Sequence, residues 1–186
     1  TEIFESNLDL QKYLKIFKDI ENIFITDIDG NICLSGLPEA LELNISEYSI
    51  YQNLKNNHEI KKWTDQTTTV SPATSKDVLL LGEKLYDLEG NLIGFLIIAS
   101  DFSAFYNQFI KPITIGKEGY GTLFNQNGIC VYHPVQDLIY KNMSDNEFIS
   151  GVMKEKRGFK RYFWIDNKWK YASYDTETIT GFSIIY

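Results

Sequence analysis

The hydrophobic pattern of the chain changes its period after the first segment. Between residues 5 and 21, apolar side chains recur every three or four positions, which predicts an amphipathic helix. Beyond it, short apolar runs are separated by Asp, Asn and Gly, a pattern typical of strands joined by tight turns. The run at 92–100 is apolar at nearly every position and predicts a strand in the centre of a sheet.

The same order of predicted elements occurs twice along the chain. A strand, a turn of the form Asp/Asn-x-x-Gly, a return strand, a helix and further antiparallel strands are expected in 22–110 and again in 111–186. The helices of the two segments are predicted at 46–57, with Ser46 as N-cap, and at 146–155. A period of about 100 residues predicts tandem domains and not a solenoid. The predicted fold class is α+β, with two antiparallel sheets and covering helices.

Composition and charge narrow the classes of function. Hydrophobic residues make up 44% of the 186 residues and aromatic residues 15%, which is enough for buried cores. The formal net charge of −7 argues against nucleic acid and anionic membrane surfaces, because both require clusters of Lys and Arg. No apolar run approaches the ~18 residues of a membrane span. We therefore expect a globular protein without a nucleic-acid partner.

The residue types that usually carry catalysis or bind metals are few and scattered. His58 and His133 have no second ligand at metal-binding spacing, and His133 is predicted to be a hydrogen-bonded turn residue. Cys33 and Cys130 lie in apolar, strand-like surroundings and are both expected to be buried. The segment Asp27–Asn31 lacks the Glu of a calcium loop and is predicted to be a hairpin turn. We expect no catalytic residue, no metal site and no cofactor.

Two segments resemble a known family of receptor domains. Residues 115–134, which contain Gly119-Tyr120-Gly121 and end in His133-Pro134, are similar to the opening of the membrane-proximal module of double Cache (dCache) sensor domains. Residues 87–103 resemble the closing strands of the membrane-distal module of the same family. Together with weaker matches that follow residue 134, at Asn142-Met143-Ser144, Gly158 and Thr180-Gly181-Phe182, these segments extend the similarity over nearly the whole chain.

This resemblance implies an architecture and a function. The architecture is two tandem PAS-like (Cache) modules joined by a long N-terminal helix: a signalling helix at 1–21, a membrane-distal, ligand-binding module at 22–110 and a membrane-proximal module at 111–186. The function is small-molecule sensing outside the cytoplasm for a transmembrane receptor, whose output is a histidine kinase, a chemotaxis or a cyclic-dinucleotide domain. Membrane helices that flank the domain and a homodimeric full-length receptor are implied as well. The domain itself is not expected to be an enzyme.

The resemblance also points to ligand-binding residues in the distal module, and these candidates are Tyr48, Tyr51, Trp63, Thr69, Ser71 and Asp101. In amino-acid-binding members of the family, an Arg binds the ligand carboxylate through two hydrogen bonds and an Asp binds its amino group. Here Tyr48 falls at the position of that Arg, and Ala99 or Asp101 at that of the Asp. Without the Arg, an ordinary amino acid is not favoured, and a small organic acid, an amino-acid-like molecule, an amine or no direct ligand stays open.

Protein interaction is the alternative class of function. A distal module without a ligand would instead dock a periplasmic partner or mediate dimerisation through the N-terminal helix. An exposed apolar stripe on residues 8–20 would mark this alternative.

Overall fold

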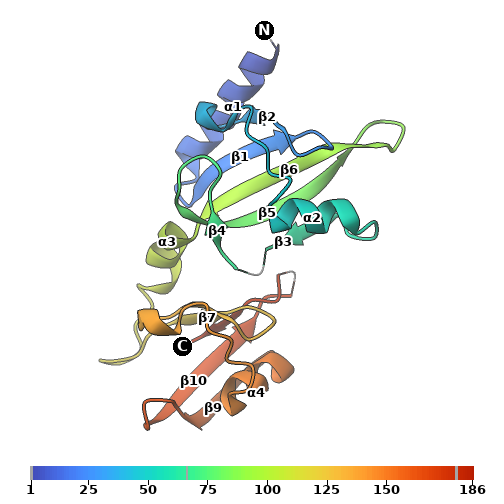
Figure 1. Ribbon diagram of the computed structural model, residues 1–186. Coiled ribbons are helices and arrows are strands. Elements are labelled where there is room, and N and C mark those ends of the chain that lie inside the picture. The colour runs from blue at the N-terminus through green and yellow to red at the C-terminus, as the bar shows by residue number, and fades with distance from the viewer. Residues whose placement is uncertain (1, 66, 179) are drawn as a thin grey trace. The chain divides into compact units, whose positions relative to one another are not determined.

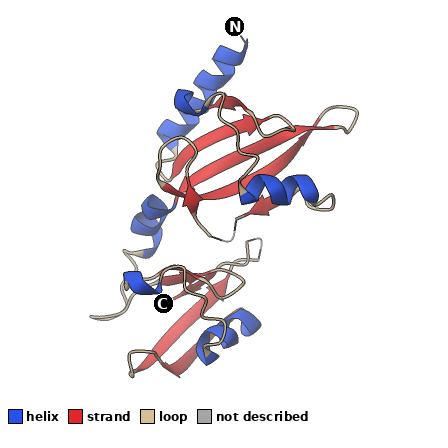
Figure 2. Ribbon diagram, in the orientation of Figure 1, coloured by secondary structure: helices blue, strands red, loops and turns tan. Residues whose placement is uncertain are grey.

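The computed structural model describes residues 2–65, 67–178 and 180–186, with side chains from residue 7 onward (Figure 1). The chain divides into two compact units, Thr1–Phe105 (unit 1) and Tyr106–Tyr186 (unit 2). Each unit contains one antiparallel sheet and a small number of helices (Figure 2). The predicted α+β class with two PAS-like modules is confirmed. That unit 1 is the membrane-distal module stays a prediction.

Unit 1 is built on a six-stranded sheet with the order β2-β1-β6-β5-β3, in which β4 also pairs with β5. The strands are β1 (Ile20–Thr26), β2 (Ile32–Ser35), β3 (Lys62–Thr64), β4 (Thr69–Val70), β5 (Asp77–Tyr86) and β6 (Leu92–Asp101). The helices are α1 (Glu2–Ile16), the short 3-10 helix η1 (Pro38–Ala40), α2 (Ser49–Asn56) and α3 (Phe102–Phe105). Helix α1 packs against β1 and β2, whereas α2 packs against β5 and β3.

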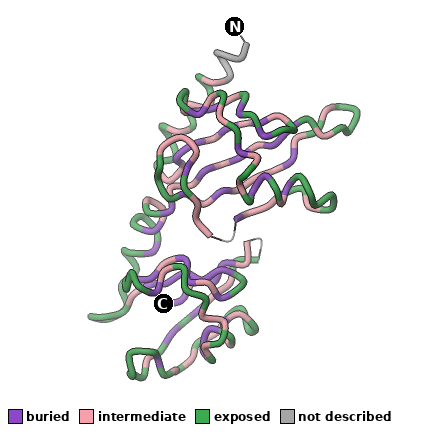
Figure 3. Tube along the Cα trace, in the orientation of Figure 1, coloured by how far each residue is buried: buried purple, intermediate pink, exposed green. Residues whose placement is uncertain are grey.

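The apolar run at 92–100 forms β6, the central strand of this sheet. Phe95, Ile97 and Ala99 of this strand are fully buried and belong to the core of unit 1 (Figure 3). The hairpin turn after β1 is also as predicted. A carboxylate oxygen of Asp27 accepts hydrogen bonds from the backbone N–H groups of Asp29 and Asn31, both at 2.9 Å. The turn therefore uses the acidic side chain to close the backbone.

Unit 2 repeats this plan with a five-stranded sheet in the order β8-β7-β11-β10-β9. The strands are β7 (Thr122–Phe124), β8 (Cys130–Tyr132), β9 (Arg157–Phe163), β10 (Trp169–Thr176) and β11 (Ser183–Ile185). The helices are the π-helix η2 (Tyr106–Ile110), the 3-10 helix η3 (Gln136–Leu138) and α4 (Glu147–Glu155). Asn146 caps α4 by accepting hydrogen bonds from the backbone N–H groups of Phe148 and Ile149.

Two predicted features of the helices are wrong. The first helix ends at Ile16 and not at residue 21, because the next residues join the sheet: the Asp19 carbonyl accepts hydrogen bonds from Asp101 N–H (2.8 Å) and the Ser100 hydroxyl (3.2 Å). Ser46 does not cap α2, whose N-cap is Tyr48, without a hydrogen bond from its side chain. The expectation that the N-terminal helix joins the modules is not confirmed, since α1 lies within unit 1.

The two cysteines differ in burial, although both were expected to be buried. Cys130 in β8 is fully buried, and burial raises the pKa of its thiol to about 12. Cys33 is exposed, because β2 is an edge strand and Cys33 lies on its solvent side, next to the buried Ile32. His133 is buried and accepts a hydrogen bond from Val135 N–H, as predicted for a turn residue.

Candidate functional site

A row of residues runs across the unit 1 sheet and defines one of its faces. Asp65 lies opposite Leu80, since its N–H donates to the Leu80 carbonyl (2.9 Å) and extends the β3–β5 pairing by one residue. Leu80 pairs with Ala99 of β6, and Ala99 pairs with Asn22 of β1. Directly opposed residues of neighbouring strands point to the same face. Asp65, Leu80, Ala99 and Asn22 therefore share one face, here called the α2 face.

Helix α2 covers this face, as its position in front of β5 and β3 in Figure 1 shows. Gly82 in β5 has no side chain and so allows α2 to approach the sheet closely. A Cβ at this position would lie 2.5 Å from Leu54 and 3.1 Å from Ile50, both of α2. Trp63 of β3 pairs with Gly82 and so lies on the same face, where it packs against the core together with Tyr48. Two of the predicted ligand-binding aromatic residues thus pack against the core of unit 1.

Asp65 is a buried acid on this face, with only 3% of its surface exposed. Burial raises the pKa of Asp65 to about 6, an effect that the nearby Ser49 hydroxyl and Trp63 indole oppose. Neither Oδ2 of Asp65 nor Nε1 of Trp63, however, reaches a partner with hydrogen-bond geometry in the described part of the chain. A buried polar atom without a partner costs free energy, so these two atoms are suited to meet a polar group that comes from outside.

A second buried acid lies beside the end of the row. Glu21 sits at a bulge in β1, immediately before Asn22, and is 9% exposed. Its Oε1 accepts hydrogen bonds from the hydroxyls of Ser71 (2.9 Å) and Thr74, both in the segment that leads from β4 to β5. Its Oε2 is buried without a hydrogen-bond partner among the described residues. Ser71, a predicted site residue, therefore holds this carboxylate in place.

Unit 1 has little positive charge to offer, and two of its lysines are already paired within the protein. Residues 1–105 contain no arginine. Lys84, on the α2 face, donates to the Asn57 carbonyl (2.7 Å), and Lys76 forms an ion pair with Asp101 (3.2 Å). Asp101 also accepts a hydrogen bond from Ala104 N–H (2.9 Å) and begins the turn into α3. Both of its carboxylate oxygens are thus engaged within the protein.

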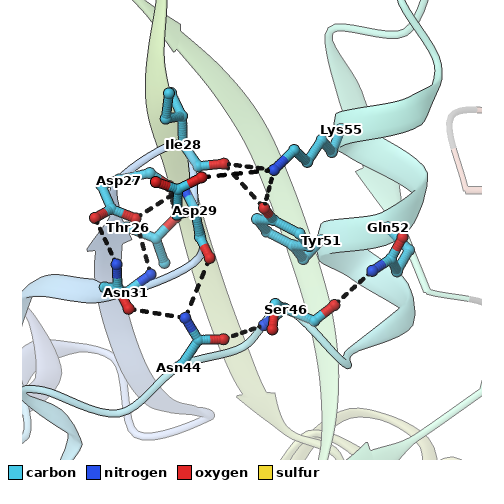
Figure 4. Close-up of polar contacts among 10 residues, drawn as sticks. All are labelled: Thr26, Asp27, Ile28, Asp29, Asn31, Asn44, Ser46, Tyr51, Gln52 and Lys55. Carbon is cyan, nitrogen blue, oxygen red and sulfur yellow. Dashed lines mark hydrogen bonds and ion pairs between the residues drawn. The ribbon is translucent and has the colours of Figure 1, made fainter.

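Tyr51 has a different environment from the one predicted for a ligand-binding residue. Its ring is buried edge-on against Phe95, at 5.4 Å between ring centroids. Its hydroxyl donates to the Ile28 carbonyl (2.9 Å) and accepts from the Lys55 ammonium (2.6 Å), as Figure 4 shows. The polar end of Tyr51 therefore ties α2 to the β1–β2 turn. A ligand contact by Tyr51 would involve its ring alone.

The remaining predicted residue, Thr69, lies in β4 and pairs with Val78 of the core. The sequence reasoning did not identify Asp65 and Glu21. Strand alternation offered one signal for Asp65, because Trp63 and Asp65 are two residues apart and must share a face if the segment is a strand. Glu21 gave no such signal, since its orientation depends on the bulge in β1.

Metal binding and membrane insertion find no support in the described side chains. Within residues 7–65, 67–178 and 180–186, no group of three or more His, Cys, Asp or Glu side chains could hold a metal ion. No helix in the described part of the chain has the length and apolar character that crossing a membrane requires.

Comparison with known proteins places the chain in a family. The Cache domain family (dCache_1) matches residues 2–186. No curated protein matches the sequence. Among solved structures, the extracellular domain of the candidate histidine kinase rpHK1S-Z16 superposes with a TM-score of 0.81 at 16% identity, over 100% of this chain and 76% of that one.

Two chemoreceptor domains share the fold as well. The periplasmic sensory domain of Campylobacter jejuni Tlp1 gives a TM-score of 0.68 at 14% identity, over 99% of this chain and 85% of that one. The ligand-binding domain of Pseudomonas fluorescens CtaA, solved with L-isoleucine, gives 0.67 at 12% identity, over 97% and 72%. The family match over nearly the whole sequence and the two PAS-like units lead to one conclusion: this chain belongs to the Cache domain family, in its double Cache form.

Proposed function

We propose that this chain is the extracytoplasmic sensing domain of a transmembrane signal-transduction receptor, and that unit 1 binds a small molecule through a protonated amino group. The observation that carries the proposal is that two buried acids, Asp65 at one end of the row and Glu21 at the other, each have one carboxylate oxygen without a hydrogen-bond partner among the described residues. An ammonium group supplies both the positive charge and the hydrogen-bond donors that these oxygens lack.

The chemistry of the site favours an amine over a carboxylate-bearing ligand. L-Isoleucine, the ligand of CtaA, carries both an ammonium and a carboxylate group. Unit 1 of this chain offers a buried acid for an ammonium at each end of the row, but it has no arginine for the carboxylate, and two of its lysines, Lys84 and Lys76, are engaged. The unpartnered Trp63 N–H and the rings of Trp63 and Tyr48 add one donor and an aromatic wall, a surface that also attracts cations.

A thermal-shift series with propylamine, 1,4-diaminobutane, alanine and succinate tests this proposal. We expect the two amines to raise the melting temperature in proportion to the logarithm of their concentration, and succinate to have no effect.

Amine affinity should rise between about pH 5 and pH 7, because Asp65, whose pKa is about 6, then loses its proton. Asp65→Asn should weaken amine binding by about 100-fold, since it removes the charge partner.

Asp145→Asn provides the control, because Asp145 is an exposed acid of unit 2. It should leave the amine titration unchanged. A melting temperature that rises with succinate but not with either amine would contradict the amine proposal. The broader proposal of a sensing domain would then be tested by the same assay with organic acids and purines.

One observation also favours dimerisation through α1 as a second role. Four apolar residues in and directly after this helix are at least 40% exposed: Leu8, Tyr13, Ile16 and Phe17. Ile16 and Phe17 follow Tyr13 by three and four residues, so Tyr13 shares one side of the helix end with both of them. Exposed apolar surface of this kind marks a contact with another chain, and relay of a signal through α1 would require such a contact.

Light scattering of the purified chain tests this second role. We expect a concentration-dependent dimer that Ile16→Glu abolishes, because a buried charge at the contact would cost several kcal/mol. Leu88→Glu is the matched control, since Leu88 is fully exposed in the β5–β6 turn, away from α1. A chain that stays monomeric at all concentrations, or a dimer that Ile16→Glu leaves intact, would contradict it.

A further inference from the structure

Unit 2 contains a cavity that the proposed function does not use. Its volume is about 380 Å³, within the range of pockets that hold small molecules. It lies between α4 and the sheet, and its walls include Tyr120, Phe148, Tyr162 and Trp164. Phe148 stacks on Tyr162 at 3.7 Å between centroids, and Tyr162 meets Trp164 edge to face at 5.6 Å. The cavity is thus walled by aromatic rings that already pack against one another.

His133 faces this cavity and is 1% exposed. Its Nδ1 accepts a hydrogen bond from Val135 N–H (2.9 Å), so Nδ1 cannot carry a proton. Burial, and then the charge of Lys170, lower the pKa of His133 to about 4, so the ring is neutral at neutral pH. A neutral imidazole whose Nδ1 is unprotonated must carry its proton on Nε2. Nε2–H is therefore a buried donor, and no hydrogen-bond acceptor meets it among the described residues.

A lysine adds positive charge to the same cavity. Lys170 lines it and donates to the Tyr120 hydroxyl (3.0 Å) and to Asp166 (2.8 Å). Its ammonium lies 5.4 Å from the centroid of the Tyr120 ring and 5.9 Å from that of Trp164. Only 22% of its side chain is exposed, whereas that of Asp166 is 42% exposed. The cavity therefore offers two hydrogen-bond donors between its aromatic walls, the neutral His133 Nε2–H and the cationic Lys170 ammonium. Asp166, which competes for Lys170, is the more exposed of the two ion-pair partners.

We propose that this cavity is a second ligand site, which binds a small aromatic carboxylate. The ring of the ligand stacks among Phe148, Tyr162 and Trp164, and its carboxylate accepts the His133 Nε2–H and approaches the Lys170 ammonium. Aromatic stacking and a charge-assisted hydrogen bond are each favourable in such a partly enclosed site. The double Cache chain would then respond to two ligands of opposite charge, an amine in unit 1 and a carboxylate in unit 2.

Benzoate and indole-3-acetate are the probes, with acetate and benzyl alcohol as controls that lack the ring or the carboxylate. On the whole chain we expect both probes to quench tryptophan fluorescence saturably, and both controls to bind at least about tenfold more weakly. Saturating propylamine should not displace the probes, which separates this site from the one in unit 1. Failure of both probes to bind at about 10 mM would overturn the proposal, whatever the outcome of the amine series.

Two variants probe the donors. His133→Asn keeps an oxygen acceptor for Val135 N–H but removes the Nε2–H, and we expect it to weaken benzoate binding about tenfold or more. Lys170→Gln should weaken it comparably, and it reports on the site even if His133→Asn fails to fold. The control is His58→Asn, which changes an exposed histidine of unit 1 and should have no effect. Unchanged benzoate affinity in both His133→Asn and Lys170→Gln would overturn the proposal.

Nitrogen NMR of the histidines gives an independent readout. The ligand-free chain should show His133 as the neutral Nε2–H form, with its imino proton shifting downfield when benzoate is added. The opposite tautomer in the free protein would remove the donor on which the proposal rests and would overturn it.

Discussion

Replacing Asp65 with asparagine should make the ligand-free domain more stable at neutral pH. The folded-state pKa of Asp65 is about 6, above its ordinary value of 3.8, because burial disfavours the charged carboxylate. The native state therefore holds the proton more tightly than the unfolded chain. Stability falls as the pH rises from about 4 to about 6, and remains lower above that range. Asparagine is never charged and avoids this loss.

The expected gain in stability of Asp65→Asn follows from the folded-state pKa of about 6 and the ordinary pKa of 3.8. Each pKa unit corresponds to about 1.4 kcal/mol, so the buried charge costs up to about 3 kcal/mol at neutral pH. The asparagine amide still lacks part of its hydrogen bonding, which leaves an expected gain of about 1–3 kcal/mol, or roughly 5 °C in melting temperature. Near pH 4 the wild-type acid is protonated as well, and the gain should disappear.

Calorimetric melting at several pH values between about 4 and 8 measures this dependence. The diagnostic quantity is the difference in melting temperature between Asp65→Asn and wild type, which should grow as the pH rises from about 4 to about 6 and level off above that range. Asp145→Asn, at the exposed position in unit 2, should change stability by less than about 0.5 kcal/mol at every pH. A pH-independent difference for Asp65→Asn would show that Asp65 is not held with a raised pKa. If Asp65→Asn also weakens amine binding, as proposed, its greater stability would match the exchange of stability for function that is typical of a binding site.

Gly94→Ala is expected to destabilise unit 1 by about 3 kcal/mol or more. Gly94 lies in the central strand β6, and a Cβ there would be only 1.9 Å from the carbonyl oxygen of Thr26 in β1. This oxygen belongs to the backbone of a paired strand, so it cannot rotate away as a side-chain end could. Relief requires the β1 and β6 strands to separate locally, which breaks hydrogen bonds in the centre of the sheet.

Gly90→Ala is the matched control from the turn that precedes the same strand. Gly90 has a positive φ of 88°, and a Cβ there would meet nothing within 4 Å. Its cost is limited to backbone strain of about 1 kcal/mol. Hydrogen exchange of the β6 amides measures the stability of unit 1 in both variants, with β10 amides as the reference in unit 2. Equal losses of protection in the two variants would contradict the steric argument.

The sequence alone determined the two sheets, their hairpins and the central strand β6. These features depend on period-two alternation and on Asp, Asn and Gly at turns, which are properties of neighbouring residues. The Asp27 turn and the Asn146–Glu155 helix could therefore be predicted within one or two residues. Strand β3 (Lys62–Thr64) was missed, because three residues at a sheet edge are too few to show a period.

Tertiary structure decided which side chains are buried at the two acids of unit 1. Asp65 became a buried acid because pairing with β5 extends past the end of β3, and Glu21 because a bulge in β1 places it against Ser71. The same long-range pairing ended the first helix at Ile16. Burial and the partners of a polar atom depend on residues far away in sequence, so no local pattern encodes them. Sequence determined which segments form the sheets, and packing decided which of their polar atoms have no hydrogen-bond partner among the described residues.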